Sequence, residues 1–328
     1  MIPAMQDLDM AQDEAPIQGA VLICGPTASG KSALALTLAR EFGGVIINAD
    51  SMQVYTELRV ITNRPTPEEE VQAPHRLYGV RPAREPYSAA LWLEDVKAAL
   101  DEAVRQSWLP ILVGGTGLYF KALTEGLSDI PAIPDEIRSH YRAMAQAQPP
   151  QALYAELLRR DPLTAARLRP GDPQRIVRAL EVLEATGLPL ASWQAEKRPP
   201  LIPFSRAYAL AVTIERGELY RRCDVRFDEM LANGAIEEAR AVEAMGLDPA
   251  LPAMRAVGLP QLLAYIRGDI ALAEAVSSAK TATRNYAKRQ ITWMRGNFEK
   301  WNPHKAQYME RTKREIAIFI EKRLTGRS

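Results

Sequence analysis

Residues 25–32 of this chain are Gly25-Pro26-Thr27-Ala28-Ser29-Gly30-Lys31-Ser32, which is the G-x-x-x-x-G-K-[ST] spacing of a phosphate-binding P-loop. The apolar run at 19–24 before it is typical of a buried parallel strand, and the pattern at 32–42 after it predicts a helix. In such an arrangement, backbone N–H groups and the positive end of the helix dipole point at one place. The stretch therefore predicts an anion site that binds a diphosphate or a triphosphate.

Two side chains of this loop carry the chemistry expected of a phosphate site. Lys31 adds a full positive charge, and the hydroxyl of Ser32 is placed to ligate a phosphate-bound Mg²⁺. A glycine turn that happens to contain a lysine is the alternative interpretation. The motif alone identifies neither the phosphate compound nor the reaction.

The composition is that of an ordinary globular protein of 328 residues, with 47% apolar and 25% charged residues. That length fits two domains, or one core with a large insertion. The net charge of +1 gives no hint of a nucleic acid partner, so any basic surface must come from an uneven distribution of charge.

Three features bear on the compartment. The two cysteines are Cys24 and Cys223, and Cys24 falls in the predicted buried strand, so a structural disulfide is not expected. No apolar run approaches the roughly 18 residues of a membrane span. Residues 1–17 are acidic, lack the features of a signal peptide and are expected to form a disordered tail. We therefore expect a cytoplasmic protein with no membrane partner.

Further candidate residues follow two other predicted strands. Residues 45–49 are typical of a buried strand that ends at Asp50, and residues 109–113 run into Gly114-Gly115-Thr116-Gly117. Because ligands bind at the carboxyl ends of strands in an open parallel sheet, both segments should lie on the same edge as the P-loop. Asp50 either holds Mg²⁺ or accepts a proton there, or it caps a short turn. The glycines around Thr116 either let a ligand approach the backbone or form a tight turn.

The order of patterns predicts an α/β fold, with a P-loop NTPase-like core whose parallel sheet is flanked by helices, and an all-helical insertion domain. Short helices punctuated by prolines, without strand patterns, occupy residues 130–199, the predicted insertion. An apolar strand pattern returns at 207–214. Residues 18–129 and 200–328 are therefore assigned to the catalytic core and its C-terminal helices.

Positive charge gathers in the insertion. Its most regular helix, at 173–185, begins after the N-cap Asp172 and ends at Gly187. Arg175 and Arg178 are three residues apart and share one face of this helix. Four more arginines of the insertion add positive charge: Arg138, Arg142, Arg167 and Arg169.

A second basic helix is predicted at 271–295, with no acidic residue between Glu274 and Glu299. Its cations are interleaved with Tyr286 and Trp293, and they are Lys280, Arg284, Lys288, Arg289 and Arg295. A charge run on a helix is commonly a solvated face. One without compensating acids instead predicts contact with a phosphate backbone, with Arg284 and Lys288 as candidates.

Five motifs together resemble one family, the tRNA dimethylallyltransferases, also called tRNA isopentenyltransferases. The resemblance covers residues 19–300, and the motifs occur in the family's order: G-P-T-A-S-G-K-S (25–32), A-D-S-M-Q-V-Y (49–55), V-G-G-T-G-L-Y (113–119), D-P-Q-R-I-V-R-A-L-E-V (172–182) and T-R-N-Y-A-K-R-Q-I-T-W (283–293). The resemblance implies transfer of a dimethylallyl group from dimethylallyl diphosphate to N6 of adenosine 37 in tRNA, with Mg²⁺ as cofactor. It also implies binding of the anticodon stem-loop, and we expect a monomer.

The resemblance assigns roles to the candidate residues. The loop Gly25–Ser32 would hold the diphosphate of the prenyl donor rather than ATP, and Arg226 would support it. Asp50 would be the general base on N6, with Lys31 and Thr116 completing the catalytic set. The tRNA contacts would include Asp50, Ser51, Met52, Gln53, Thr116, Arg138, Gln174, Arg175, Ile176, Val177 and Arg178, in addition to Arg284 and Lys288 of the basic helix.

The chain departs from the family at one motif. Where the family usually has G-Y-R-Q, this chain has Gly258-Leu259-Pro260-Gln261, in a segment that resembles a tRNA-contacting one. Either that contact is dispensable, or Arg255 or Arg267 compensates for the missing arginine.

Two other enzyme functions compete with tRNA prenylation. A P-loop kinase of a small molecule would use the arginines of the insertion as a lid, but it has no need of the basic helix with aromatics. An adenylate isopentenyltransferase would act on free AMP or ADP, but that family lacks the motif found at 172–182. A non-enzymatic RNA-binding switch that senses a nucleotide is the third alternative.

Overall fold

The computed structural model describes residues 19–305 and 309–325, and it divides into two compact units. The described residues up to 120 and from 202 onward form one, called here the core unit, and residues 121–201 form the helical unit. The acidic tail predicted at residues 1–17 lies outside the described residues. Within the described ranges, no helix has the length and apolar character needed to cross a membrane.

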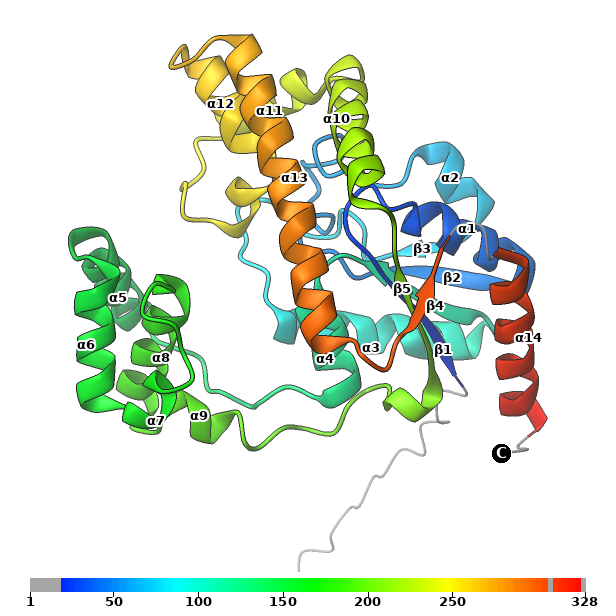
Figure 1. The fold of residues 1–328 in the computed structure, drawn as a ribbon, viewed down its shortest axis with the longest axis horizontal. Coiled ribbons are helices and arrows are strands. Elements are labelled where there is room, and N and C mark those ends of the chain that lie inside the picture. The colour runs from blue at the N-terminus through cyan, green and yellow to red at the C-terminus, as the bar shows by residue number, and fades with distance from the viewer. Residues whose placement is uncertain (1–18, 306–308, 326–328) are drawn as a thin grey trace, which may run out of the picture. The chain divides into compact units, whose positions relative to one another are not determined.

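The core unit combines a sheet with surrounding helices (Figure 1). Its strands are β1 (Ala20–Cys24), β2 (Gly44–Asn48), β3 (His75–Arg76), β4 (Leu109–Gly114), β5 (Ala207–Val212) and β6 (Asn302–His304). Its helices are α1 (Lys31–Phe42), α2 (Pro67–Gln72), α3 (Ala89–Arg105), α4 (Gly117–Glu125, which continues into the helical unit), η1 (Phe204–Arg206), α10 (Arg216–Ala232), α11 (Ala235–Ala244), η2 (Pro252–Arg255), α12 (Leu259–Arg267), α13 (Leu272–Asn297) and α14 (Met309–Thr325).

The strands described in the core unit are all parallel, in the order β3-β2-β4-β1-β5-β6. The apolar runs predicted β1, β2, β4 and β5, and these strands are confirmed, as is the α/β fold class. Strands β3 and β6 were not predicted, because two and three residues are too short to show a pattern. Pro303 in β6 fits its place at the edge, where a missing N–H is tolerated.

Strand β1 is fully buried between β4 and β5, so the P-loop that follows it emerges in the middle of the sheet. Leu34 and Leu38 of α1 pack in one apolar cluster with side chains of β1, β4 and β5, and Ile316 of α14 joins them. On α3, the indole N–H of Trp92 donates to the carbonyl of Asn48, at 2.8 Å. These contacts fix the strand ends from which the candidate residues project.

The backbone of the P-loop is held in an uncommon conformation. Ala28 has a φ of 63°, which is rare for a residue with a side chain, and Gly30 has a φ of 90°. Ala28 is buried and packs with Leu219 of α10 and Ala287 of α13. Helices distant in sequence therefore hold the P-loop in shape.

The helical unit has its own apolar core. Its helices are α5 (Asp135–Ala147), α6 (Pro150–Arg160), α7 (Pro162–Ala165), α8 (Pro173–Thr186) and α9 (Leu190–Trp193). The predicted caps of α8 are confirmed. The carboxylate of Asp172 accepts a hydrogen bond from the N–H of Arg175, and Gly187 ends the helix with a φ of 69°.

The three glycines of Gly114-Gly115-Thr116-Gly117, at the end of β4, are required by neighbouring protein atoms. A Cβ at Gly115 would lie 2.0 Å from Nε2 of Gln290, and one at Gly117 would lie 2.0 Å from the ring of Trp293. At Gly114 it would lie 2.0 Å from a carbonyl oxygen of the loop after β2. None of the three has a positive φ. Protein packing therefore explains these glycines, which admit α13 and the loop after β2, and no turn at these three positions needs a glycine conformation. The approach of a ligand to this backbone stays a prediction.

We expect Gly117→Ala to lower the melting temperature, because a methyl group there overlaps the indole of Trp293, and overpacking typically costs about 1–3 kcal/mol. The matched control is Gly296→Ala in α13, where no atom lies within 4 Å of the new Cβ. That change should leave stability equal or higher, since alanine is favoured over glycine in helices by about 1 kcal/mol. An unchanged melting temperature for Gly117→Ala would contradict this account of the loop.

Candidate active site

A single cavity of the core unit brings together residues from several strand ends, and its volume is about 260 Å³. Polar lining comes from the P-loop, the loop after β2, α10 and α13, through Thr27, Asp50, Ser51, Arg226, Tyr286 and Arg289. Apolar lining comes from Ile61, Phe227, Met230 and Val257. The predicted P-loop and the carboxylate of Asp50 thus line the same cavity.

Two cations beside the P-loop have no carboxylate partner. Lys31 donates to the carbonyl of its own loop residue Pro26, at 3.4 Å, and Arg226 lines the cavity. In residues 19–305 and 309–325 neither forms an ion pair, although Arg222 on the same helix is paired with Glu218. Burial lowers the pKa of Lys31 and of Arg226; for Lys31, the charge of Asp50 opposes this change and that of Arg226 adds to it. A bound anion would relieve both effects, so this is the electrostatics of an anion site.

Further observations in the loop fit a phosphate ligand. The hydroxyl of Ser29 is buried and finds no hydrogen-bond partner among the described residues. The second residue of α1, Ser32, is exposed at the helix N-terminus. Mg²⁺ in phosphate sites usually takes one or two protein oxygens together with phosphate oxygens and water. The exposed hydroxyl of Ser32 fits this arrangement.

Asp50 caps a turn, as one of the two interpretations left open by the sequence predicted, and it also lines the cavity. Its Oδ1 accepts a hydrogen bond from the N–H of Met52 at 3.0 Å, so it caps the turn after β2. Its own N–H donates to the side chain of the buried Asn48, at 2.8 Å, which fixes where the carboxylate projects. Asp50 nevertheless lines the cavity, and Oδ2 has no hydrogen-bond partner within the described residues. Oδ1 therefore stabilises the turn, whereas Oδ2 can contact a ligand in the cavity.

Thr116 lies next to the Asp50 turn, but it is not among the residues that line the cavity. Its hydroxyl oxygen accepts from the N–H of Ser51 at 3.0 Å and donates to the hydroxyl of Ser51 at 3.3 Å. The geometry gives Thr116 a positioning role for the turn that carries Asp50. Gln53 is similarly engaged, because its amide donates to the carbonyl of Thr62 at 2.9 Å.

Gln290 is a residue whose role sequence patterns did not indicate. It is buried on α13, its Oε1 accepts from the N–H of Thr27 at 2.8 Å, and its Nε2 donates to the carbonyl of Gly115 at 3.0 Å. One side chain therefore joins the P-loop to the loop after β4. A neutral amide in a basic helix gives no signal of this kind in the sequence.

We expect Gln290→Ala to lower the melting temperature and to weaken the binding of inorganic diphosphate measured by calorimetry. Two backbone groups lose their partner, and each buried unsatisfied group costs about 1–3 kcal/mol. Gln290→Glu keeps an acceptor for Thr27 but loses the donor for Gly115, so its effect should be intermediate. The exposed Gln106→Ala is the control, and equal behaviour of the Gln106 and Gln290 variants would refute the bridging role.

The basic helix is compensated by its neighbour. Arg284 of α13 forms an ion pair with Asp224 of α10 at 2.5 Å, and Lys280 forms one with Asp228 at 2.7 Å. The inference of a helix without compensating acids is therefore wrong at these two positions, because the acids come from another element. Lys288 differs, since it lines an open surface hollow with Asn285, Arg289, Thr292 and Trp293.

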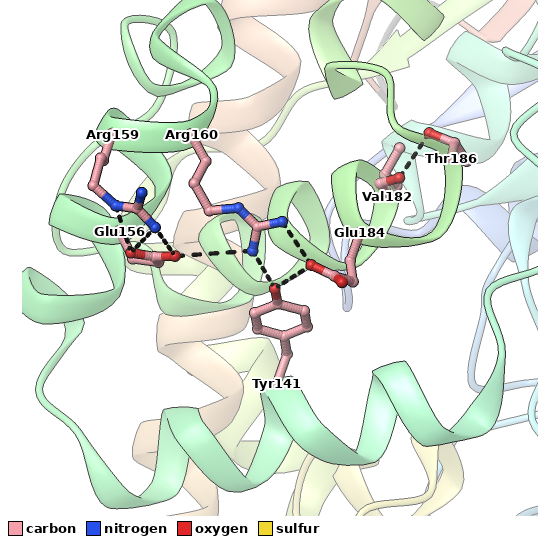
Figure 2. A network of polar contacts seen from close by, with 7 residues as sticks. All are labelled: Tyr141, Glu156, Arg159, Arg160, Val182, Glu184 and Thr186. Atoms are coloured by element: carbon pink, nitrogen blue, oxygen red, sulfur yellow. Dashed lines mark hydrogen bonds and ion pairs between the residues drawn. The ribbon is translucent and has the colours of Figure 1, made fainter.

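Arg159 and Arg160 of the helical unit are held in a polar network (Figure 2). Arg160 donates to the hydroxyl of Tyr141 at 2.7 Å and to the carboxylate of Glu184 at 2.6 Å. Arg159 makes a bidentate pair with Glu156. The hydrogen bond from Arg160 holds the pKa of Glu184 below its usual value. Arg160 therefore ties α6 to α5 and α8, whereas the Arg159–Glu156 pair lies within α6.

The predicted tRNA-contacting segment of α8 is only partly exposed. Arg175 is exposed and lies 3.4 Å from Asp172, and Arg178 is half-buried and lies 3.5 Å from Glu181. The side chain of Ile176 is fully buried in the core of the helical unit. Ile176 is therefore corrected to a core residue, because its side chain has no access to a ligand. Arg138 lies 3.8 Å from Asp135.

The segment that departs from the family pattern begins α12. Leu259 is fully buried there, so it serves packing. Of the two arginines considered as substitutes, Arg267 is held in a bidentate pair by Glu243, at 2.7 and 2.8 Å. Arg255 lines the cavity instead, which makes it the better placed of the two.

Comparisons with known proteins agree with this geometry. The IPP transferase family model matches residues 53–297. A tRNA dimethylallyltransferase from Bradyrhizobium sp. (strain ORS 278) is 54% identical over 295 residues, covering 89% of this chain and 96% of that protein. The full-length tRNA isopentenylpyrophosphate transferase from Bacillus halodurans has a TM-score of 0.67 and 31% identity, covering 94% of this chain and 98% of that one. A eukaryotic dimethylallyltransferase acting on tRNA has a TM-score of 0.77 and 26% identity, covering 94% of this chain and 80% of that one. The chain therefore belongs to the IPP transferase family.

Proposed function

We propose that this chain transfers the dimethylallyl group of dimethylallyl diphosphate to N6 of adenosine 37 in tRNA and releases diphosphate. The observation that carries the proposal is the cavity in which Asp50 and Arg226 share the lining with the P-loop residue Thr27. Membership of the IPP transferase family supports it, as do the names of the relatives.

The leaving group determines what the P-loop must do. The exocyclic amine of adenine is a weak nucleophile because its lone pair is delocalised into the ring, so the reaction depends on departure of diphosphate from an allylic carbon. The backbone N–H groups of the P-loop, Lys31 and Arg226 are in place before reaction, and they stabilise the growing negative charge with little reorganisation. Mg²⁺ bound with Ser32 would supply further positive charge to the diphosphate.

The acceptor determines what Asp50 must do. As the C–N bond forms, N6 becomes cationic and loses a proton. Oδ1 of Asp50 is occupied by the N–H of Met52, so Oδ2 is the oxygen that takes this proton. The hydrogen bonds of Thr116 to Ser51 keep the turn, and with it the carboxylate, in position.

The apolar lining fits the prenyl group. Ile61, Phe227 and Met230 line the cavity, and its volume of about 260 Å³ suits a small substituent. This volume is below the roughly 300–1,000 Å³ of pockets for drug-sized ligands. An apolar enclosure also keeps water away from an allylic cation, which water would otherwise capture.

Both units supply candidates for tRNA binding. Lys288 and Arg289 border an open hollow with Trp293 in the core unit, and Arg175 is exposed on the helical unit. The target adenosine must leave its stack, which costs a few kcal/mol. Contacts between these cations and tRNA phosphates offset that cost.

The test is incubation with labelled dimethylallyl diphosphate and unmodified tRNA, followed by nucleoside analysis. We expect the label in N6-(dimethylallyl)adenosine. In a parallel incubation that supplies AMP or ADP as the acceptor, label in the free nucleotide, with none in tRNA, would instead identify an adenylate isopentenyltransferase. Thermal stabilisation by ATP and none by dimethylallyl diphosphate would favour a small-molecule kinase.

We expect Asp50→Asn to lower turnover by about 10²–10⁴-fold, which is the usual contribution of a general base. Asparagine retains an oxygen for the N–H of Met52, so the turn should persist and tRNA affinity should change little. Single-turnover rates and tRNA dissociation constants separate the two effects. Parallel losses of turnover and affinity would argue against the general-base role.

We expect Arg175→Ala to weaken tRNA binding and to reduce the slope of log affinity against log salt by about 1, because one phosphate contact is lost. Arg159→Ala is the matched control in the same unit: its guanidinium is held by several close hydrogen bonds to Glu156, whereas that of Arg175 makes only a 3.4 Å contact with Asp172. Identical salt slopes for the unaltered chain and Arg175→Ala would exclude the contact.

A further inference from the structure

Glu238, in the first turn of α11, commits both carboxylate oxygens to one loop of the core unit. Its Oε2 accepts hydrogen bonds from the N–H groups of Arg59 and Val60, at 2.8 and 2.7 Å. Its Oε1 accepts from the N–H of Ile61, at 2.9 Å. Successive N–H groups that converge in this way form a nest for an anion, and here a distant side chain fills it.

The loop that Glu238 holds, residues 58–64, forms part of the cavity described above. Ile61 and Thr62 line the cavity, and so do Arg226, Phe227 and Met230 of α10. Helix α11 follows α10 after Gly234, which has a φ of 96°. Glu238 therefore connects the loop that lines the cavity to α11, the helix that directly follows the cavity-lining helix α10.

Other hydrogen bonds of the loop are local in sequence. The N–H of Asn63 donates to the carbonyl of Val60 at 3.0 Å, and the amide of Gln53 donates to the carbonyl of Asn63 at 2.8 Å. Within the described ranges, the hydrogen bonds between this loop and α10 or α11 all come from Glu238. Glu238 therefore supplies the hydrogen bonds that join this loop to the α10–α11 pair.

We propose that Glu238 is a positioning residue that fixes the size of the apolar part of the cavity and so restricts the donor to a single five-carbon prenyl unit. This inference rests on the proposed function, because it takes the alkyl group of the donor to lie beside Ile61 and Phe227. Loss of the three hydrogen bonds lets the loop move away from α10. The cavity then holds a five-carbon chain less firmly and admits a ten-carbon chain.

The experiment compares dimethylallyl diphosphate with geranyl diphosphate, using the same tRNA, in the unaltered chain and three variants. Glu238→Ala should raise KM for the five-carbon donor more than it lowers kcat. It should also reduce the five- over ten-carbon ratio of kcat/KM by about tenfold, the lower end of what a hydrophobic pocket discriminates. Glu238→Gln keeps one carbonyl oxygen as an acceptor, so its effects on KM and on selectivity should be intermediate. Glu237→Ala, an exposed neighbour on the same helix, should match the unaltered chain.

Amide hydrogen exchange at residues 59–61 gives a readout that does not depend on catalysis. Faster exchange there in both Glu238 variants, together with reduced chain-length selectivity, supports the inference, and Glu238→Gln carries the test if Glu238→Ala does not fold. Faster exchange with unchanged selectivity overturns the inference while leaving the proposed function intact, and so does unchanged exchange. Failure of the unaltered chain to use dimethylallyl diphosphate at all would instead overturn the proposed function.

Discussion

The close packing of α13 on the loop after β4 is the constraint on which the site depends. Gly115 and Gly117 leave no room for a Cβ there, so Gln290 can reach the N–H of Thr27 and the carbonyl of Gly115 together. Because buried backbone groups must keep partners, the P-loop and the loop after β4 cannot move independently while α13 is in place. The proposed anion site is therefore preorganised by packing between segments far apart in the chain, and the P-loop sequence supplies only its local part.

The cations of the chain differ in whether the fold itself pairs them with a carboxylate. Cations that hold elements together are paired, as Arg284 is with Asp224 and Arg160 with Glu184. Lys31 and Arg226 are left without a carboxylate in the described chain, although burial disfavours their charged forms. A folded protein tolerates that cost where a ligand of opposite charge relieves it. The overall charge of +1 conceals this local imbalance, which is why composition alone indicated no anionic partner.

The features that the sequence predicted well have local signals. The strand, loop and helix around the P-loop depend on residues a few positions apart, as do the four apolar strands and the cap at Asp172. Gln290 and Glu238 were not identified, because an amide and a helical glutamate carry no mark of the distant backbone groups that they bind. The helix at 271–295 was taken as uncompensated for the same reason, since its counter-charges lie on α10. Strand β6 is three residues long, and only its neighbour β5 defines it.

Asp50 and Glu238 are both carboxylates, but the fold engages their oxygens to different extents. Both carboxylate oxygens of Glu238 accept hydrogen bonds from backbone N–H groups, three in all, so this side chain anchors the loop rather than contacting a substrate. In Asp50, Oδ1 accepts a hydrogen bond from the N–H of Met52, and Oδ2 has no hydrogen-bond partner in the described ranges. A carboxylate whose oxygens all accept backbone hydrogen bonds is fixed in place, whereas one with an oxygen left over is oriented and can still contact a ligand. The number of oxygens that the fold itself uses therefore supports the two proposals made above, a general base at Asp50 and a positioning residue at Glu238.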